Sequence, residues 1–328
     1  MRLQWRHSGN EKSPLVPVGT RVNTFQASAP GRCGIVGNPS DIYGGVVVSC
    51  SLPVRATCRL TLGQTNGRPD DTRLWDAAMI RFPIQEPVDV HWQTDVPRSS
   101  GLSGSTALLA ATLACVRATR GEANPLEDRT AFTELLRDIE RNDANIVCGY
   151  QDAYMIVFGG LQRVDLAGKH PTQGGPPATL TPIDAPLPFL LITTGVERLS
   201  GSVHGPMVQR WVNGEKQVVD AMQRIGELGR EGANALAKHD WETLARAMTE
   251  NHQLVADLGG SGEPIDDLIH ACKKHGAKAA KLAGAGLGGT VIALAEDPDE
   301  LENRLKAEGY AKFLRPAIAP GLTLETPL

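Results

Sequence analysis

Hydrophobic and polar residues alternate over residues 46–62 in the way that β-strands require. The segment begins with β-branched residues, and its second half places apolar side chains at every other position. This period of two predicts a strand. Residues 106–120 are instead rich in Ala and Leu, without an internal Gly or Pro, and predict a helix.

Further helices are expected along the rest of the chain. They are residues 132–141, 215–238, 241–258 and 265–275. The last one ends in Lys273 and Lys274 shortly before Gly276, which are the basic last turn and the glycine stop of a helix C-terminus. Residues 291–295, Val-Ile-Ala-Leu-Ala, predict a short strand. The chain therefore contains both helices and strands.

A change of character divides the chain near Pro186. Residues 168–188 are rich in Pro, Gly and Thr, and the pattern changes there from mixed strand and helix to mostly helix. With 328 residues, of which 41% are hydrophobic, the chain is long enough for two domains with real cores. We expect these domains to cover residues 1–186 and 187–328.

Composition narrows the classes of protein. The formal net charge is −4 and no long Lys/Arg run occurs, which argues against a nucleic-acid-binding surface. The longest apolar run, residues 189–193, is too short to span a bilayer, and the first residues lack a signal-peptide core. A cytoplasmic location without membrane contact is therefore expected. The six cysteines form no C-x-x-C pair, so neither a zinc cage nor a disulfide framework is expected.

Residues 101–107, Gly-Leu-Ser-Gly-Ser-Thr-Ala, open directly into the helix predicted at 106–120. Glycines let the backbone approach a ligand, and the first turn of a helix offers unpaired N–H groups that favour an anion. The segment can therefore cradle a phosphate, although it is no Walker A loop because no Lys follows Gly104. The alternative is that its serines only cap the helix.

A second glycine-rich segment, residues 281–290, satisfies G-x-G-x-x-G through Gly284, Gly286 and Gly289. A dinucleotide-binding fingerprint must follow a strand and open a helix. Here the strand predicted at 291–295 comes after the glycines, so we reject NAD binding. On its own the segment is equally consistent with a tight β-turn.

Two more segments carry charged residues beside glycines and turns. Arg32 and Asp41 flank the turn that begins at Gly37, and Asp152 follows the run from Cys148 to Gln151. An isolated Arg or Asp in a turn is usually solvated or caps a helix. A carboxylate in a pocket can also accept or orient the proton of a hydroxyl during phosphoryl transfer.

In their order along the chain, these segments resemble the signature motifs of the GHMP small-molecule kinases, named for galactokinase, homoserine kinase, mevalonate kinase and phosphomevalonate kinase. The resemblance covers nearly the whole chain. It implies the α+β fold of that family, with a ribosomal-protein-like βαβ N-terminal domain and a ferredoxin-like C-terminal domain. It also implies that ATP and a small metabolite meet in the cleft between the two domains.

The resemblance assigns the nucleotide loop and the metal ligands. Residues implied to bind ATP are Pro97, Ser100, Gly101, Leu102, Ser103, Gly104, Ser105 and Thr106. The family's usual Gly-Leu-Gly-Ser-Ser reads Gly-Leu-Ser-Gly-Ser here, with Ser103 and Gly104 exchanged. Ser105 is implied to hold Mg²⁺ together with an acidic residue, for which Glu140 is the first choice and Glu134 the competitor.

The resemblance also assigns the chemistry. Asp152 is implied to be the catalytic carboxylate, and Arg32 is implied to lie near the transferred phosphoryl group. Residues implied to contact the substrate are Asn38, Asp41, Tyr43, Arg98, Gly286 and Gly288. The Glu-His of galactokinase is replaced by Asn38 and Pro39, which argues against galactose as the substrate.

Four segments are similar to the glucuronokinase branch of the family, namely residues 37–41, 97–105, 151–161 and 200–211. The reaction implied is transfer of the γ-phosphoryl group of ATP to the anomeric hydroxyl of D-glucuronate, whose carboxylate could pair with Arg98 or Arg210. The alternative acceptors are a heptose phosphate, fucose, arabinose and galacturonate. Alternatives from other classes are a catalytically silent sensor of ATP and sugar, and a sugar-phosphate-binding interaction protein without nucleotide.

Overall fold

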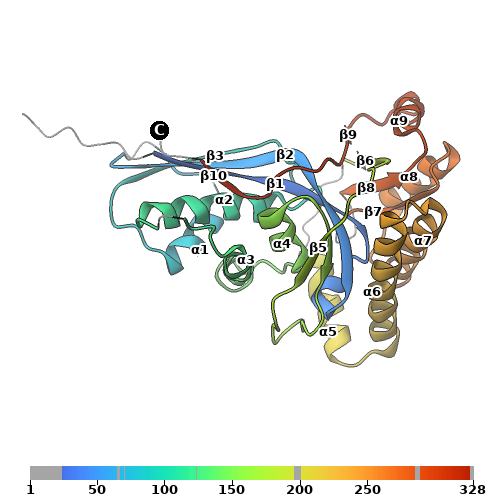
Figure 1. Cartoon of the computed structure of the whole chain (residues 1–328), viewed down its shortest axis with the longest axis horizontal. Helices are drawn as coiled ribbons and strands as arrows, with labels where there is room; N and C mark the ends of the chain where they lie inside the picture. Colours follow the sequence, from blue (N-terminus) through green and yellow to red (C-terminus); the bar gives the residue numbers. More distant parts are fainter. Residues whose placement is uncertain are drawn as a thin grey trace, which may run out of the picture.

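Two sheets, each with helices packed against it, organise the chain (Figure 1). The computed structural model describes residues 24–64, 67–69, 71–122, 124–195, 201–284 and 289–325, with the backbone alone at 201–204. Among the described strands, every pairing is antiparallel. Within these ranges no helix combines the length and the apolar character needed to cross a membrane.

The first sheet is built on two long neighbouring strands. Its strands are β1 (Thr24–Val36), β2 (Val46–Leu62), β3 (Val88–Thr94), β4 (Leu161–Asp165), β5 (Thr179–Pro182) and β10 (Thr323–Glu325). They follow the order β10-β1-β2-β4-β5, and β3 pairs with the second part of β2 whereas β4 pairs with its beginning. The strand predicted at 46–62 is therefore confirmed as β2, which links β1, β3 and β4.

Helices cover one face of the first sheet. They are α1 (Arg73–Arg81), α2 (Gly104–Thr119), α3 (Arg129–Asp138) and α4 (Gln151–Phe158). α2 is apolar on nearly all sides because it is buried between the sheet and the other helices. Trp75 and Phe132 are fully buried in the same core. The helix predicted at 106–120 is thus confirmed as α2.

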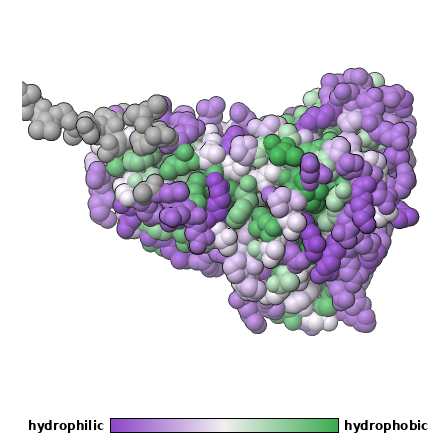
Figure 2. Space-filling model, in the orientation of Figure 1, coloured by the Kyte–Doolittle hydropathy of each residue, from purple (hydrophilic) through white to green (hydrophobic). Residues whose placement is uncertain are grey.

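The second sheet has the order β7-β8-β6-β9. Its strands are β6 (Phe189–Thr193), β7 (Ala279–Leu282), β8 (Thr290–Leu294) and β9 (Phe313–Leu314), and the helices of this part are α5 (Gly201–Val212), α6 (Lys216–Ala237), α7 (Trp241–Asp257), α8 (Glu263–Lys274) and α9 (Pro298–Ala307). α8 and α9 pack on the sheet through apolar residues such as Leu268 and Leu301, and hydrophilic side chains cover the outer helices at the right of Figure 2. The sequence predictions of α6, α7, α8 and β8 are confirmed.

Helix α6 joins the two parts by packing against the long strands of the first sheet. An added Cβ at Gly229 would lie 1.8 Å from the carbonyl oxygen of Val46, so only glycine lets the helix come this close. Cys33 of β1 shares a core with Leu228 of α6 and Phe189 of β6. The two parts therefore share buried apolar surface, which fixes their relative position.

The chain passes from the first sheet to the second between β5 and β6, close to the boundary expected after residue 186. It returns at its end, because β10 pairs with β1 beside the first part (Figure 1). The backbone N–H of Leu322 also donates to the carbonyl oxygen of Ile156 in α4. The last described residues therefore pack on the first part.

Candidate active site

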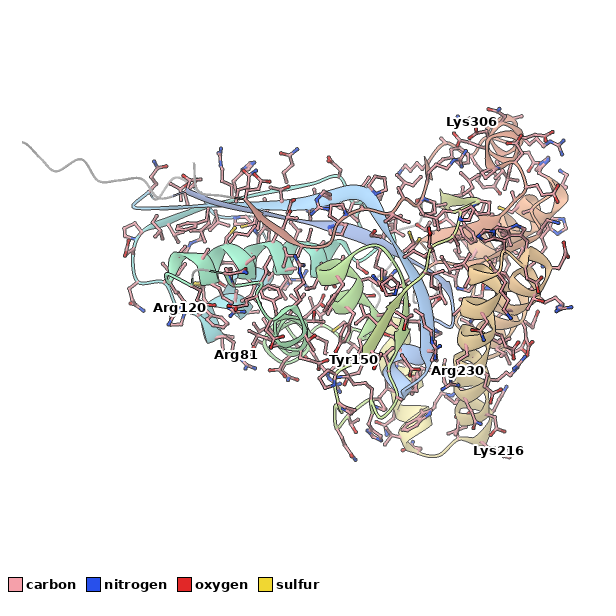
Figure 3. All side chains as sticks on the ribbon, in the orientation of Figure 1. Arg81, Arg120, Tyr150, Lys216, Arg230 and Lys306 are labelled. Carbon is pink, nitrogen blue, oxygen red and sulfur yellow. The ribbon has the colours of Figure 1, made fainter. Side chains whose placement is uncertain are left out.

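A cavity of about 1040 Å³ opens between segments that are far apart in the sequence. Its lining includes Arg32 of β1, the turn at 38–41, the loop 97–106, residues 145–149 and the beginning of α4. Tyr150, which Figure 3 labels, stands in the sequence between two lining residues, Gly149 and Gln151, and is not itself part of the lining. The volume suffices for a small-molecule site, since such sites measure roughly 300–1,000 Å³.

Residues with a positive φ angle alternate with residues without one along part of loop 97–106. Ser99, Gly101 and Ser103 have positive φ angles of 51°, 75° and 63°, and the residues between them do not. This alternation turns successive N–H groups toward one side and makes an anion-binding concavity. The side chain of Ser103 makes no capping bond to α2, and its buried Oγ has no partner among the described residues. The side chain of Ser103 therefore does not cap the helix.

An ion pair joins the buried Arg32 to the half-buried Asp152. Arg32 Nε and Nη2 donate to Asp152 Oδ1 at 2.7 and 2.5 Å. Arg32 Nη1 donates to the carbonyl oxygen of Gly101 at 2.7 Å, which ties the guanidinium group to loop 97–106. Both bonds to Asp152 end on Oδ1, so its Oδ2 accepts none from Arg32. Asp152 is part of the lining of the cavity.

Glu140 is a buried carboxylate beside the same loop. Thr106 Oγ1 donates to its two oxygens at 2.9 and 3.0 Å, and Ser105 Oγ lies 3.4 Å from Oε1. Burial raises the pKa of Glu140 to about 7, and the negative charge of Asp152 adds to the rise. Glu140 forms no ion pair with any described residue, so its charge is uncompensated.

The sequence prediction of a helix at 132–141 places the end of that helix wrongly. α3 ends at Asp138, and the next residues form a π-helical turn, Ile139–Asp143, which contains Glu140. Arg81 pairs with Asp138 at 2.8 Å and with Asp143 at 2.6 Å, so it holds both ends of this turn. Single π-helical turns are frequent at functional sites, and this one carries the buried carboxylate.

Glu134 lies in different surroundings. Lys169 Nζ donates to its two carboxylate oxygens at 2.8 and 2.7 Å, and the hydroxyl of Tyr154 donates to it as well. Glu134 is absent from the lining of the cavity, whereas Glu140 is part of it. Glu134 is thus paired with a cationic side chain, whereas Glu140 lines the cavity and has no ion-pair partner among the described residues.

Asp41 is buried against the segment that leads into α4. The backbone N–H of Gln151 donates to Asp41 Oδ2 at 3.0 Å. A Cβ at Gly149 would lie 2.0 Å from the same oxygen, so only glycine leaves room for the carboxylate. Burial raises the pKa of Asp41 to about 6, although the bond from Gln151 lowers it, and the charge of Asp152 contributes to the rise.

Lys281 and Asn38 fix the turn after β1. The buried Nζ of Lys281 donates to Asn38 Oδ1 at 2.7 Å and to the carbonyl oxygen of Leu282 at 2.6 Å. Asn38 Nδ2 donates to the carbonyl oxygen of Gly284 at 3.0 Å. Burial lowers the pKa of Lys281 to about 7. Asn38 lines the cavity and Lys281 does not, so the lysine supports the turn from behind.

The second glycine-rich segment connects β7 and β8, which pair with each other. The strand predicted at 291–295 follows the glycines as β8. Thr290 Oγ1 donates to the carbonyl oxygen of Ser100 at 3.0 Å, so the segment packs against loop 97–106. Gly286 and Gly288, which the resemblance placed at the substrate, lie outside the described residues.

The other predicted substrate residues differ in position. Arg98 lines the cavity, as do Asn38 and Asp41. Tyr43 is not part of the lining, and its ring packs on that of Trp211 with the centroids 5.5 Å apart. Arg210 pairs with Glu215 at 2.6 Å and is also outside the lining. All the residues expected to bind ATP line the cavity.

The oxygen atoms at Glu140 suit a divalent cation. Mg²⁺ prefers hard oxygen ligands and is usually held by one or two carboxylates together with substrate phosphates. Within the described ranges, no group of three or more His, Cys, Asp or Glu side chains could hold a metal ion. The oxygens of Glu140 and Ser105 are ligands of the kind that Mg²⁺ prefers, so these residues are compatible with a cation that also binds a phosphate.

Comparison with known proteins identifies the family. The model of the GHMP kinases N terminal domain matches residues 72–160, and that of the GHMP kinases C terminal domain matches residues 233–311. Probable glucuronokinase 2 of Arabidopsis thaliana is 30% identical over 344 residues, which cover 89% of this chain and 91% of that protein. The chain belongs to the GHMP kinase family. It is therefore an ATP-dependent small-molecule kinase, as the sequence predicts.

Other relatives of this GHMP kinase agree with the assignment. Glucuronokinase 1 of Arabidopsis thaliana is 29% identical over 88% of this chain and 91% of that protein. D-glycero-alpha-D-manno-heptose 7-phosphate kinase of Campylobacter jejuni is 22% identical over 89% of this chain and 96% of that protein. The structure of Lactococcus lactis galactokinase complexed with galactose has a TM-score of 0.75 at 18% identity and covers 93% of this chain and 95% of that one. The predicted two-domain fold is confirmed.

Sequence reasoning missed two buried residues at the site of this GHMP kinase. Gln151 lines the cavity and Lys281 supports Asn38, and both stand inside motifs that the sequence analysis used. Their position beside predicted site residues could have indicated them, since Gln151 precedes Asp152 and Lys281 precedes the glycines. Residue type alone did not separate them from solvated side chains.

Proposed function

We propose that this GHMP kinase is a sugar kinase that transfers the γ-phosphoryl group of ATP to the anomeric hydroxyl of D-glucuronate. The products are ADP and the 1-phosphate of the sugar acid. The similarity to two glucuronokinases over most of the chain supports this acceptor. The observation that carries the proposal is the Arg32–Asp152 pair, which lines the same cavity as loop 97–106 and is hydrogen-bonded to that loop at Gly101.

Loop 97–106 binds the triphosphate of ATP. Its alternating backbone presents N–H groups to the phosphate oxygens, and the N-terminal end of α2 favours negative charge. The buried Ser103 Oγ, which has no partner among the described residues, is a further donor for a phosphate oxygen. These groups position the γ-phosphoryl group beside Arg32.

Asp152 orients and deprotonates the acceptor. Its Oδ2 accepts the proton of the anomeric hydroxyl while Arg32 holds the other oxygen. The hydroxyl oxygen then attacks the γ-phosphorus, the bond to the oxygen that bridges the β- and γ-phosphates breaks, and ADP leaves. Phosphoryl transfer depends mainly on positioning and charge, and the guanidinium group of Arg32 provides positive charge at the transferred group.

Ser105 and Glu140 would hold the Mg²⁺ that accompanies ATP, which would supply positive charge to the phosphates. Glu140 suits this role because it is unpaired at the cavity, whereas Glu134 is occupied by Lys169. Ser105 lies at the first turn of α2, next to the triphosphate.

Asn38, Asp41 and Arg98 bind the acceptor. Asp41 accepts hydrogen bonds from sugar hydroxyls, and Asn38 is fixed behind it by Lys281. Arg98, at the wall of the cavity, pairs with the carboxylate of glucuronate, because a planar guanidinium group matches a carboxylate. Tyr43 and Arg210 have no place in this proposal. Gly286 and Gly288, the domain boundary at residue 186 and the cytoplasmic location stay predictions.

A heptose phosphate is the second candidate acceptor, because the heptose 7-phosphate kinase of Campylobacter jejuni matches 89% of the chain. Arg98 would then meet a phosphate instead of a carboxylate. A silent sensor is the candidate from another class. It would need to bind ATP and sugar but would have no use for Asp152.

Release of ADP from ATP and Mg²⁺ in the presence of single acceptors tests the proposal. The panel contains D-glucuronate, galacturonate, neutral sugars and sugar phosphates, and Asp152→Asn is the control. We expect selective turnover of D-glucuronate, which the variant lowers by roughly 10²–10⁴-fold. Turnover of another acceptor would refute glucuronate and keep the kinase, while binding of ATP and sugar without ADP release would favour the sensor.

A further inference from the structure

Gln151 is a buried amide in the wall of the cavity. Only 3% of the residue is exposed, yet it belongs to the lining. Its Oε1 is buried and has no hydrogen-bond partner among the described residues. Buried polar groups in native proteins are nearly always paired, so an orphaned one in a substrate cavity points to a ligand group that completes it.

The neighbours of Gln151 show which kind of ligand group this is. Its backbone N–H donates to Asp41 Oδ2 at 3.0 Å, and Asp152 is the next residue in the first turn of α4. Ionised carboxylates only accept hydrogen bonds, whereas an amide side chain both donates and accepts. A sugar hydroxyl also does both. A wall that places an amide beside two carboxylates therefore matches a ring with several hydroxyls.

We propose that the side-chain amide of Gln151 hydrogen-bonds a non-reacting hydroxyl of the acceptor sugar and selects against sugars that lack it. The proposal rests on the proposed sugar-kinase function, but it requires neither glucuronate nor its carboxylate. A site built to bind a hydroxyl rejects the analogue without it, because the buried group of the protein is then left unpaired.

A cycle of variant and substrate tests the proposal. kcat/KM is measured for the wild-type enzyme and for Gln151→Met, with the acceptor that turns over in the panel and with each of its single-deoxy analogues. For D-glucuronate these are the 2-, 3- and 4-deoxy compounds. Methionine keeps the size of the side chain and removes its hydrogen bonds. Gln162→Met is the matched control, since Gln162 on β4 also has an unpaired Oε1 but lies outside the lining.

We expect Gln151→Met to lower kcat/KM for the full sugar by roughly 10- to 100-fold, with KM for ATP unchanged. With one deoxy analogue the wild type and the variant should agree within about twofold, because the hydroxyl that Gln151 binds is already missing. With the other analogues the original factor should persist, and Gln162→Met should behave as the wild type throughout. An equal factor for every analogue would overturn the proposal, since Gln151 would then only support α4.

If Gln151→Met does not fold, Gln151→Asn replaces it in the same cycle, because it keeps an amide but withdraws it by one methylene group. Failure of the proposed acceptor is a separate outcome: a different sugar from the panel takes the place of glucuronate and the cycle is unchanged. If no acceptor turns over, sugar affinity measured by calorimetry with ADP present replaces kcat/KM. Equal affinity of the wild type and Gln151→Met would overturn this proposal, and absence of sugar binding by the wild type would overturn both.

Discussion

Replacing Asp41 by Asn tests whether the substrate site lowers the stability of the protein. Burial raises the pKa of Asp41 from 3.8 to about 6, so between these values the native protein keeps a proton that the unfolded chain has lost. The free energy of unfolding therefore falls as pH rises through this window, because the unfolded state binds fewer protons. A pKa unit corresponds to about 1.36 kcal/mol, so the loss above pH 6 amounts to about 3 kcal/mol.

Asparagine has the same shape, can still accept the bond from Gln151, and does not titrate. Urea denaturation of both proteins between pH 4.5 and pH 8 gives the difference in the free energy of unfolding at each pH. Glu140 and the other titrating groups are present in both proteins, so their contributions largely cancel. We expect Asp41→Asn to gain up to about 3 kcal/mol relative to the wild type as pH rises to 7, and to lose acceptor turnover. A difference that does not vary with pH would refute the reasoning.

Two further substitutions test the assignments at the cavity. Glu140→Gln should raise the Mg²⁺ concentration for half-maximal activity by roughly 10- to 100-fold. The matched Glu134→Gln should leave this concentration unchanged and lower the melting temperature, because it unpairs Lys169. The reverse result in Mg²⁺ titrations would make Glu134 the ligand. Gly149→Ala would put a Cβ 2.0 Å from Asp41 Oδ2. It should lower kcat/KM for the acceptor by roughly 10²-fold and leave KM for ATP unchanged. Steady-state kinetics near those of the wild type would show that Asp41 does not bind the acceptor.

The sequence predicted several elements with a clear pattern, but it missed the long strand β1 as well as the shortest strands. α2, α6, α7, α8 and β2 carry enough apolar positions for their period to be recognised. β9 contains two residues and β10 three, which is too few for a period of two to be visible. The pairing of β10 with β1 joins the two ends of the described chain, and local pattern holds no information about such a contact.

The site was predictable as a set of residues but not as a set of contacts. Arg32 and Asp152 are 120 residues apart in the sequence, and nothing local indicates that their side chains meet. Arg81, which lies in α1, pairs with Asp138 and Asp143 on either side of Glu140, and no local pattern announces these contacts. The resemblance to a family supplied these residues, whereas their hydrogen bonds required the fold.

Lys281 shows how burial decides which cation can assist phosphoryl transfer. A lysine next to a glycine-rich segment suggests a phosphate contact, and Arg32 lies close enough to affect its charge. The fold instead turns Lys281 toward Asn38, and burial lowers its pKa to about 7, which favours the neutral amine. A guanidinium group keeps its charge in such surroundings and can bond Asp152 and Gly101 at once. In the proposed reaction the positive charge at the transferred group comes from Arg32, while Lys281 bonds Asn38 in the turn after β1.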